Sequence, residues 1–116
     1  NILPLDDTIE TTTLVTHAQQ SWTRFSDDSG ESITAIERVL FEPGQRHQTI
    51  YFSFVPSLIA VPEITTHIVE GPPATIRLDE TQTFGARLEL KLGQKYEEPI
   101  ELIIQIEMVA VRTVAA

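Results

Sequence analysis

The most constraining feature of this sequence is an alternation of apolar and polar side chains near its C-terminus. In residues 84–92 (FGARLELKL), five apolar side chains share one parity, and Arg87, Glu89 and Lys91 occupy the other. Successive side chains of a strand point to opposite faces of the sheet, so a period of two separates these two sets. The pattern predicts a strand with one face in a core and the other in water.

Residues 100–111 (IELIIQIEMVAV) extend the same alternation over a longer segment. Six apolar side chains share one face: Ile100, Leu102, Ile104, Ile106, Met108 and Ala110. The other face also carries Ile103, Val109 and Val111, too many apolar groups for open water. We expect this second face to be covered by the N-terminal segment or by a partner chain.

Shorter segments upstream predict further strands, because they are rich in β-branched and aromatic residues or alternate with a period of two. These segments are residues 11–16, 21–25, 63–69 and 74–79. In residues 21–25, Trp22 and the stem of Arg24 share one side. In residues 74–79, Ile76 and Leu78 face inward and Arg77 outward. Pro56 and Pro62 bracket an irregular corner, since proline cannot donate to a sheet ladder.

The centre of the chain contains an ambiguous segment and a turn. Residues 33–41 match helical spacing through Ile33, Ile36 and Leu40, but a strand is favoured over at least residues 37–41. The reason is Pro43-Gly44, a strong turn signal that follows at once. Residues 39–54 (VLFEPGQRHQTIYFSF) therefore predict a hairpin with a loop of about five residues.

Seven or eight short strands with frequent turn signals predict an all-β fold, an antiparallel β-sandwich of six to eight strands. The expected organisation has three parts: an N-terminal segment (1–20), which is an arm or edge strand contacting a neighbouring chain, a β-sandwich domain (21–112) and a C-terminal tail (113–116). A chain of 116 residues fits one such domain.

Composition excludes several classes of function. The formal net charge is −9, which repels phosphate backbones, so we expect no nucleic-acid partner. No apolar run approaches the length of a membrane-spanning helix, so no membrane insertion is expected. The absence of cysteine excludes disulfides, thiolate metal sites and thiol catalysis.

The chain shows no catalytic or metal-binding motif. Its histidines, His17, His47 and His67, lie in three separate segments without ligand spacing. There is no nucleophile elbow and no phosphate-binding or dinucleotide fingerprint. We expect no enzyme activity, no catalytic residues, no metal and no cofactor.

The densest polar segment is residues 26–32 (SDDSGES), with three carboxylates and three serines around one glycine. Asp27, Asp28 and Glu31 could ligate calcium, although the spacing differs from an EF-hand loop. They could instead accept hydrogen bonds from the hydroxyl groups of a sugar. The third interpretation is a turn that reverses the chain and leaves its acids in water.

Three stretches resemble the H-type lectin domain family. They are residues 52–71 (FSFVPSLIAVPEITTHIVEG), residues 74–92 (ATIRLDETQTFGARLELKL) and residues 100–111. Thr83-Phe84-Gly85 stands where the family has Thr-Gly-Phe, and Met108-Val109-Ala110 stands where it has Trp-Ile-Ala. The resemblance covers about residues 21–111. Residues 39–54 also resemble a hairpin of Calx-β-type calcium domains.

The H-type lectin resemblance implies a six-stranded antiparallel sandwich that forms trimers, binds galactose or N-acetylgalactosamine, and has relatives in phage tail fibres. It carries the family's acidic sugar-binding loop to the region of Ser26, Asp27 and Asp28, and its arginine to Arg77. The family's aromatic residue has no direct counterpart here, and Tyr96 is the nearest aromatic side chain.

Two functions follow as expectations. The first is a carbohydrate-binding, lectin-like module that uses Ser26, Asp27, Asp28 and Arg77 as polar anchors and Tyr96 as a stacking ring. The alternative is a structural or assembly domain of a phage tail, capsid or cell-surface protein, without a small-molecule ligand. In either case we expect a homotrimer or higher homo-oligomer that is extracellular or associated with a virion.

Overall fold

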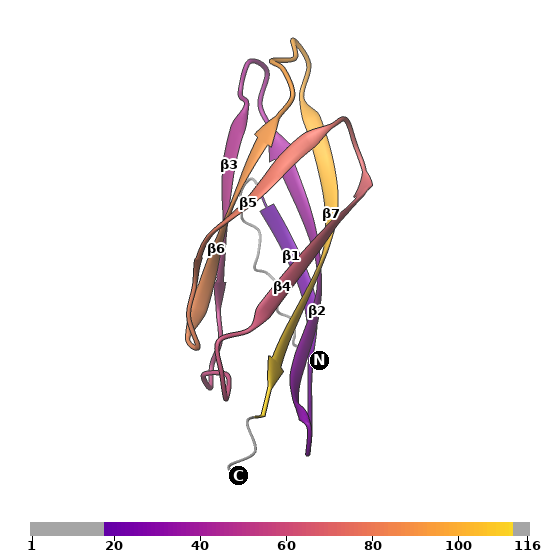
Figure 1. Cartoon of the computed structure of the whole chain (residues 1–116). Helices are drawn as coiled ribbons and strands as arrows, with labels where there is room; N and C mark the ends of the chain where they lie inside the picture. Colours follow the sequence, from indigo (N-terminus) through magenta and orange to yellow (C-terminus); the bar gives the residue numbers. More distant parts are fainter. Residues whose placement is uncertain (1–17, 113–116) are drawn as a thin grey trace, which may run out of the picture.

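The computed structural model describes residues 18–112, which form two antiparallel β-sheets and contain no helix (Figure 1). The strands are β1 (Ala18–Asp27), β2 (Gly30–Phe41), β3 (His47–Ser53), β4 (Glu63–Glu70), β5 (Ala74–Thr81), β6 (Gly85–Leu92) and β7 (Ile100–Val111). The predicted all-β sandwich is confirmed. The strand expected at residues 11–16, most of the N-terminal segment and the C-terminal tail lie outside the described residues.

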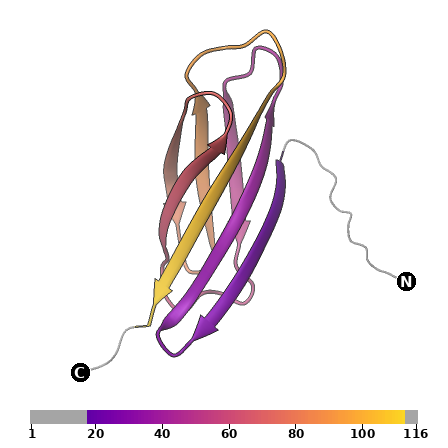
Figure 2. The same cartoon turned by 90° about the vertical axis from the view of Figure 1, so that its right-hand side faces the viewer.

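Most consecutive strands do not pair with each other as hairpins. One sheet has the strand order β1-β2-β7-β4, and the other has the order β3-β6-β5. Hairpins join β1 to β2 and β5 to β6, while the other connections between described strands pass from one sheet to the other. Figure 2 shows the two layers, with β1, β2 and β7 nearest the viewer and β3 and β6 behind them.

The core lies between the sheets and is filled by the inward parity of each strand. β2, β3, β6 and β7 supply most of it, and the largest fully buried apolar side chains are Phe41, Phe54, Ile33, Ile50, Leu88, Leu90, Leu92, Leu102, Ile104, Ile106 and Met108. The inward face predicted for residues 100–111 is confirmed. Trp22 of β1 also faces the opposite sheet, with ring centroids 6.0 Å from Phe52 and 6.2 Å from Phe54.

Residues 33–41 belong to β2, so the helical alternative is wrong. Ile33 and Val39 are buried and Ile36 is exposed, as a period of two requires. The buried parity also includes Glu37, whose side chain lies in the core. β2 pairs with β1 on one side and β7 on the other along its length. This two-sided pairing outweighs a local helical spacing of apolar residues.

The hairpin predicted for residues 39–54 is also wrong, although the connection has the expected length. β2 ends at Phe41 and β3 begins at His47, but β3 pairs with β6 in the other sheet. Both edges of β2 are already hydrogen-bonded, to β1 and to β7, so β3 has no free edge of β2 to join. The apolar faces of β2 and β3 meet across the core instead.

Two apolar side chains that were predicted to face inward are exposed. The β5–β6 pairing shifts register between Leu78 and Glu80, and Leu78 is 46% exposed. A bulge adds one residue to a strand and re-aims its side chains, which accounts for this difference. Phe84 precedes the first residue of β6, in the β5–β6 turn, and is 63% exposed.

Candidate functional site

The acidic stretch at residues 26–32 forms the tight turn between β1 and β2. Asp27 Oδ1 accepts hydrogen bonds from the Ser29 hydroxyl at 2.6 Å, the Ser29 amide at 2.8 Å and the Gly30 amide at 3.2 Å. These bonds favour the ionised carboxylate, the Ser29 hydroxyl most of all, and lower the pKa of Asp27. The geometry is that of the chain-reversing turn.

Gly30 is required by the position of this turn beside β7. Its φ is +152°, and a Cβ there would lie 2.3 Å from the carbonyl oxygen of Ala110. On the same side, the Arg112 amide donates to the Ser29 carbonyl at 2.9 Å, and Arg112 Nε donates to the Asp28 carbonyl at 3.2 Å. The turn is therefore held beside the end of β7 by the backbone amide and the side chain of Arg112.

Glu31 is bound within the fold rather than presented to a ligand. Its Oε2 accepts from Arg24 Nη2 and from the Ser26 hydroxyl, both at 2.9 Å, and its Oε1 accepts from the Ile59 amide at 3.0 Å. Arg24 Nη1 donates to the Pro56 carbonyl at 2.6 Å. The hydrogen bond from Arg24 is the main cause that lowers the pKa of Glu31. Together these contacts attach the β1–β2 hairpin to the proline corner.

Tyr96 lies at the other end of the sandwich from the acidic turn. The acidic turn directly precedes Gly30, the first residue of β2. Tyr96 lies near the other end of this strand: its carbonyl accepts a hydrogen bond from the Gly44 amide at 2.8 Å, and Gly44 follows shortly after Phe41, the last residue of β2. At about 3.3 Å per residue, β2 separates the two regions by about 36 Å. One sugar ring cannot contact both within a single chain.

Arg77 belongs to the other sheet and already has acidic partners. It lies on the outward face of β5, where its Nη2 is 2.6 Å from Glu89 Oε1 and 3.6 Å from Asp79 Oδ1. The Glu89 carboxylate raises the pKa of Arg77. Ser26, Asp27 and Asp28 are thus together at one turn, but neither Arg77 nor Tyr96 joins them in one chain.

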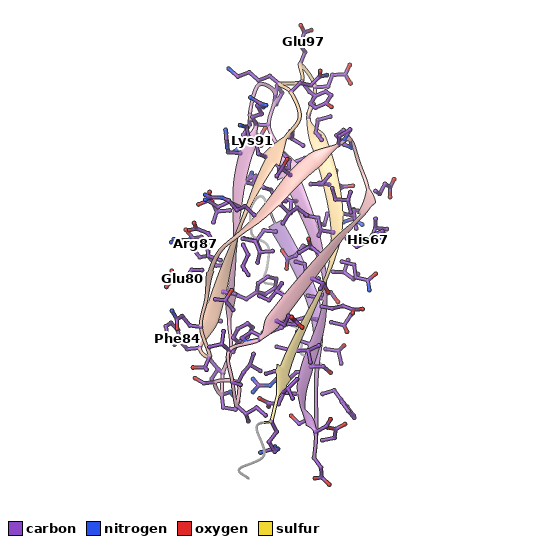
Figure 3. The ribbon with its side chains drawn as sticks, in the orientation of Figure 1. His67, Glu80, Phe84, Arg87, Lys91 and Glu97 are labelled. Carbon is purple, nitrogen blue, oxygen red and sulfur yellow. The ribbon has the colours of Figure 1, made fainter. Side chains whose placement is uncertain are left out.

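The structure instead forms an open pocket on the outer face of the three-stranded sheet, near the β5–β6 turn. Its volume is about 210 Å³. We call it the aromatic pocket, and it is lined by Tyr51, Phe52, Ser53, Glu80, Gln82, Phe84, Gly85, Ala86 and Arg87. Figure 3 shows Phe84, Glu80 and Arg87 following one another along one side of the molecule.

Two aromatic rings on this surface are unusually exposed. Tyr51 is 64% exposed and Phe84 is 63% exposed. Tyr51 faces outward because its neighbours in β3, Ile50 and Phe52, are buried on the inner face. A single exposed aromatic residue is ordinary on a protein surface, whereas two rings lining one hollow form an apolar platform for a ligand.

The polar side of the aromatic pocket depends on the bulge in β5. The register aligns Tyr51 with Arg87, and Arg87 with Glu80, across the three strands. The extra residue, Asp79, lets two consecutive carboxylates reach Arg87. Arg87 Nε donates to Asp79 Oδ2 at 2.7 Å, while Arg87 Nη2 is 3.7 Å from Glu80 Oε1. The hydrogen bond to Asp79 raises the pKa of Arg87.

Sequence reasoning missed this pocket although part of the signal was present. The alternation in TIYFSF puts Tyr51 opposite Ile50 and Phe52, which marks it as an outward aromatic residue. The exposure of Phe84 depends on where β6 begins, and the contacts of Asp79 and Glu80 depend on a bulge. Neither of these features has a local signature in the sequence.

Among residues 18–112, no group of three or more histidine or acidic side chains is placed to hold a metal ion. The same part of the chain contains no helix long and apolar enough to cross a membrane.

Comparisons of the chain with protein-family models, with curated proteins and with solved structures give no match. The H-type lectin resemblance therefore stays a prediction.

Proposed function

We propose that this protein is a carbohydrate-binding β-sandwich module and that its sugar site is the aromatic pocket. The observation that carries the proposal is the pair of exposed rings, Tyr51 and Phe84, lining a hollow that also contains Arg87, Glu80 and Gln82. The sequence predicts a site at Ser26, Asp27 and Asp28 of the acidic turn, with Arg77 and Tyr96. The contacts of Asp27 and Glu31 within the fold favour the aromatic pocket instead.

Sugar recognition needs two kinds of surface, and this pocket has both. The apolar face of a sugar ring packs against aromatic rings, while its hydroxyl groups need directional donors and acceptors. Gln82 and Ser53 supply both donors and acceptors, and Glu80 supplies a half-exposed carboxylate. The volume of about 210 Å³ is below the usual range for drug-sized ligands, which suits one sugar ring.

The test is a glycan array followed by titration of any sugar that binds, using Phe84→Ala and Tyr51→Ala. Each substitution removes one ring from the platform, so we expect each to weaken binding about tenfold. Phe25→Ala is the matched control, because Phe25 is 60% exposed and lies in β1, in the other sheet.

Three results would count against this proposal: silence across a broad array, equal losses in Phe25→Ala and Phe84→Ala, or a loss caused by Asp28→Ala instead. The last result would return the site to the acidic turn. Unchanged thermal unfolding of the variants would show that their losses come from the surface and not from misfolding.

The alternative of a structural or assembly domain is favoured by a different surface. On the outer face of the four-stranded sheet, cross-strand neighbours align Phe25 with Ser32 and Ser32 with Val109. Phe25, Val109 and Val111 are all exposed there, near the end of β7. Exposed apolar groups that lie together mark contact surfaces, so a homotrimer formed through this face is the second proposal.

Sedimentation of the whole chain tests this second proposal. A trimer that Val109→Lys converts to monomers would support it, because a charge in an apolar interface is costly to bury. A clean 13.0 kDa monomer at micromolar concentration would contradict it.

A further inference from the structure

Beside the aromatic pocket, negatively charged side chains outnumber positively charged ones. Three ionised groups lie together: Arg87, Asp79 and Glu80. Asp79 makes the closer contact with Arg87, through both Nε and Nη2, and its side chain is largely buried. Its carboxylate therefore neutralises the guanidinium. Glu80 contributes a second carboxylate, and Arg87 is the one cation among these three groups.

Glu80 is also the acid that a ligand can reach. Its carboxylate lies 3.7 Å from Arg87 Nη2, beyond hydrogen-bond distance, and about half of its side chain is exposed. Arg77 Nη2 lies 3.6 Å from Asp79 Oδ1, but its closer contact is with Glu89 Oε1, at 2.6 Å. With Arg77 and Glu89 included, the group has two cations and three carboxylates. The pocket thus combines two aromatic rings with one surplus negative charge.

We propose that the aromatic pocket selects sugars with a free amino group, and that Glu80 sets this preference. The inference rests on the proposed function, because it concerns the ligand of the same pocket. A protonated amine is attracted to the face of an aromatic ring and forms a charge-assisted hydrogen bond with a carboxylate. An N-acetylated sugar keeps the ring but loses the charge.

The opposite preference is disfavoured by the same charges. A uronic or sialic acid would bring a carboxylate toward Glu80, in a chain whose formal net charge is −9. Two carboxylates within one pocket repel each other. Arg87 does not offset this repulsion, because its guanidinium is already hydrogen-bonded to Asp79. The expected order of affinity is therefore amino sugar, then neutral sugar, then acidic sugar.

The experiment titrates the whole chain with glucosamine and galactosamine, their N-acetyl derivatives, and glucuronic acid. The titrations are run at about pH 6, where the amine is protonated. We expect each amino sugar to bind about fivefold more tightly than its N-acetyl derivative, as one half-exposed ion pair and one cation–aromatic contact would give. The preference should narrow as salt is added.

The deciding variant is Glu80→Gln, which keeps the shape of the side chain and removes its charge. We expect it to bind N-acetyl sugars as the wild type does and to lose the preference for the amine. Glu97→Gln is the matched control, since it removes one negative charge at a distant loop (Figure 3). That variant should keep the preference.

Equal affinity of the wild type for the amino and N-acetyl sugars would overturn this inference and leave the proposed function standing. A preference that persists in Glu80→Gln would overturn the role of Glu80. If none of the sugars binds, on this panel or on the array, the proposed function itself fails and the inference fails with it.

Discussion

At the scale of single residues, two acids of the first hairpin, Asp27 and Glu31, have structural partners. Asp27 closes the turn, and Glu31 joins β1, β2 and the proline corner through Arg24, Ser26 and Ile59. Only 10% of the Glu31 side chain is exposed, so water competes little for these hydrogen bonds. A polar segment that looks available in the sequence is thus largely used by the fold.

Substituting Glu31 by glutamine should lower stability at neutral pH by about 1.5–3 kcal/mol, because hydrogen bonds to a charged group are lost or weakened. The folded chain lowers the pKa of Glu31 below its ordinary value of 4.5. The carboxylate therefore stabilises the fold above about pH 4.5, and this stabilisation disappears as the pH falls through the lowered pKa.

Urea unfolding of wild type and Glu31→Gln at pH 7, 4 and 3 measures this effect. The difference between the two proteins should be largest at pH 7 and shrink toward pH 3. Glu63→Gln, at an exposed position at the start of β4, is the control and should differ little from wild type at any pH. A difference for Glu31→Gln that grows on acidification would contradict the assignment.

At the scale of elements, the bulge in β5 decides which side chains are buried and which are presented. It moves Leu78 out of the core while its cross-strand partner in β6, Leu88, stays fully buried. It also brings Asp79 and Glu80 to Arg87. One additional residue in the strand therefore shapes both the edge of the core and the polar side of the aromatic pocket.

Because of the bulge, we expect alanine substitutions of the cross-strand pair Leu78 and Leu88 to lower the stability of the protein by different amounts. Leu88→Ala should destabilise the protein by about 2–5 kcal/mol, since it leaves a cavity in a packed core. Leu78→Ala should cost less than about 1 kcal/mol, because nearly half of the side chain already meets water. Denaturant unfolding of the two variants measures both values, and equal costs would contradict the exposed position of Leu78.

Individual strands were easier to predict from the sequence than the pairing between them. β7 was predicted with its observed bounds, Ile100–Val111, because twelve residues of strict alternation leave one consistent arrangement. Within β2 a strand is favoured over at least residues 37–41, and the predicted pairing of this segment with β3 is wrong. A local turn signal reports that the chain reverses, but not whether the next strand joins the same sheet or the opposite one.

At the scale of the whole molecule, the excess of acidic groups acts on stability. A formal net charge of −9 on 116 residues produces repulsion that the compact state must tolerate. Salt screens such repulsion over a Debye length of about 8 Å at physiological ionic strength. The exposed ion pairs, such as Arg38–Glu101, are worth little and lose little when screened.

Raising sodium chloride from about 10 mM to about 150 mM should therefore raise the midpoint of thermal unfolding at pH 7. Differential scanning calorimetry measures the midpoint. The same salt series at pH 4 should give a smaller increase in the midpoint. This pH is close to the ordinary pKa values of carboxyl groups, so the net negative charge is smaller there. A midpoint that falls with salt at pH 7 would mean that favourable ion pairs outweigh the net repulsion.

The whole molecule also decides where a ligand can bind. The sugar site predicted from the sequence joins Ser26, Asp27, Asp28, Arg77 and Tyr96, which the fold places at two ends and in two sheets. The residues of the aromatic pocket come from β3, β5, β6 and the β5–β6 turn. Their convergence follows from strand order, since β6 lies between β3 and β5.

The sequence by itself determined the class of fold and the inward parity of β7, and for residues 26–32 it left a chain-reversing turn as one of three interpretations. These features follow from side chains close together in the chain, whose alternation and turn chemistry act locally. Only the tertiary structure decided which sheet each strand joins, where β5 bulges, and that Tyr51 and Phe84 share a surface with Arg87. Those outcomes depend on pairing between distant segments, where available strand edges and core packing select one register.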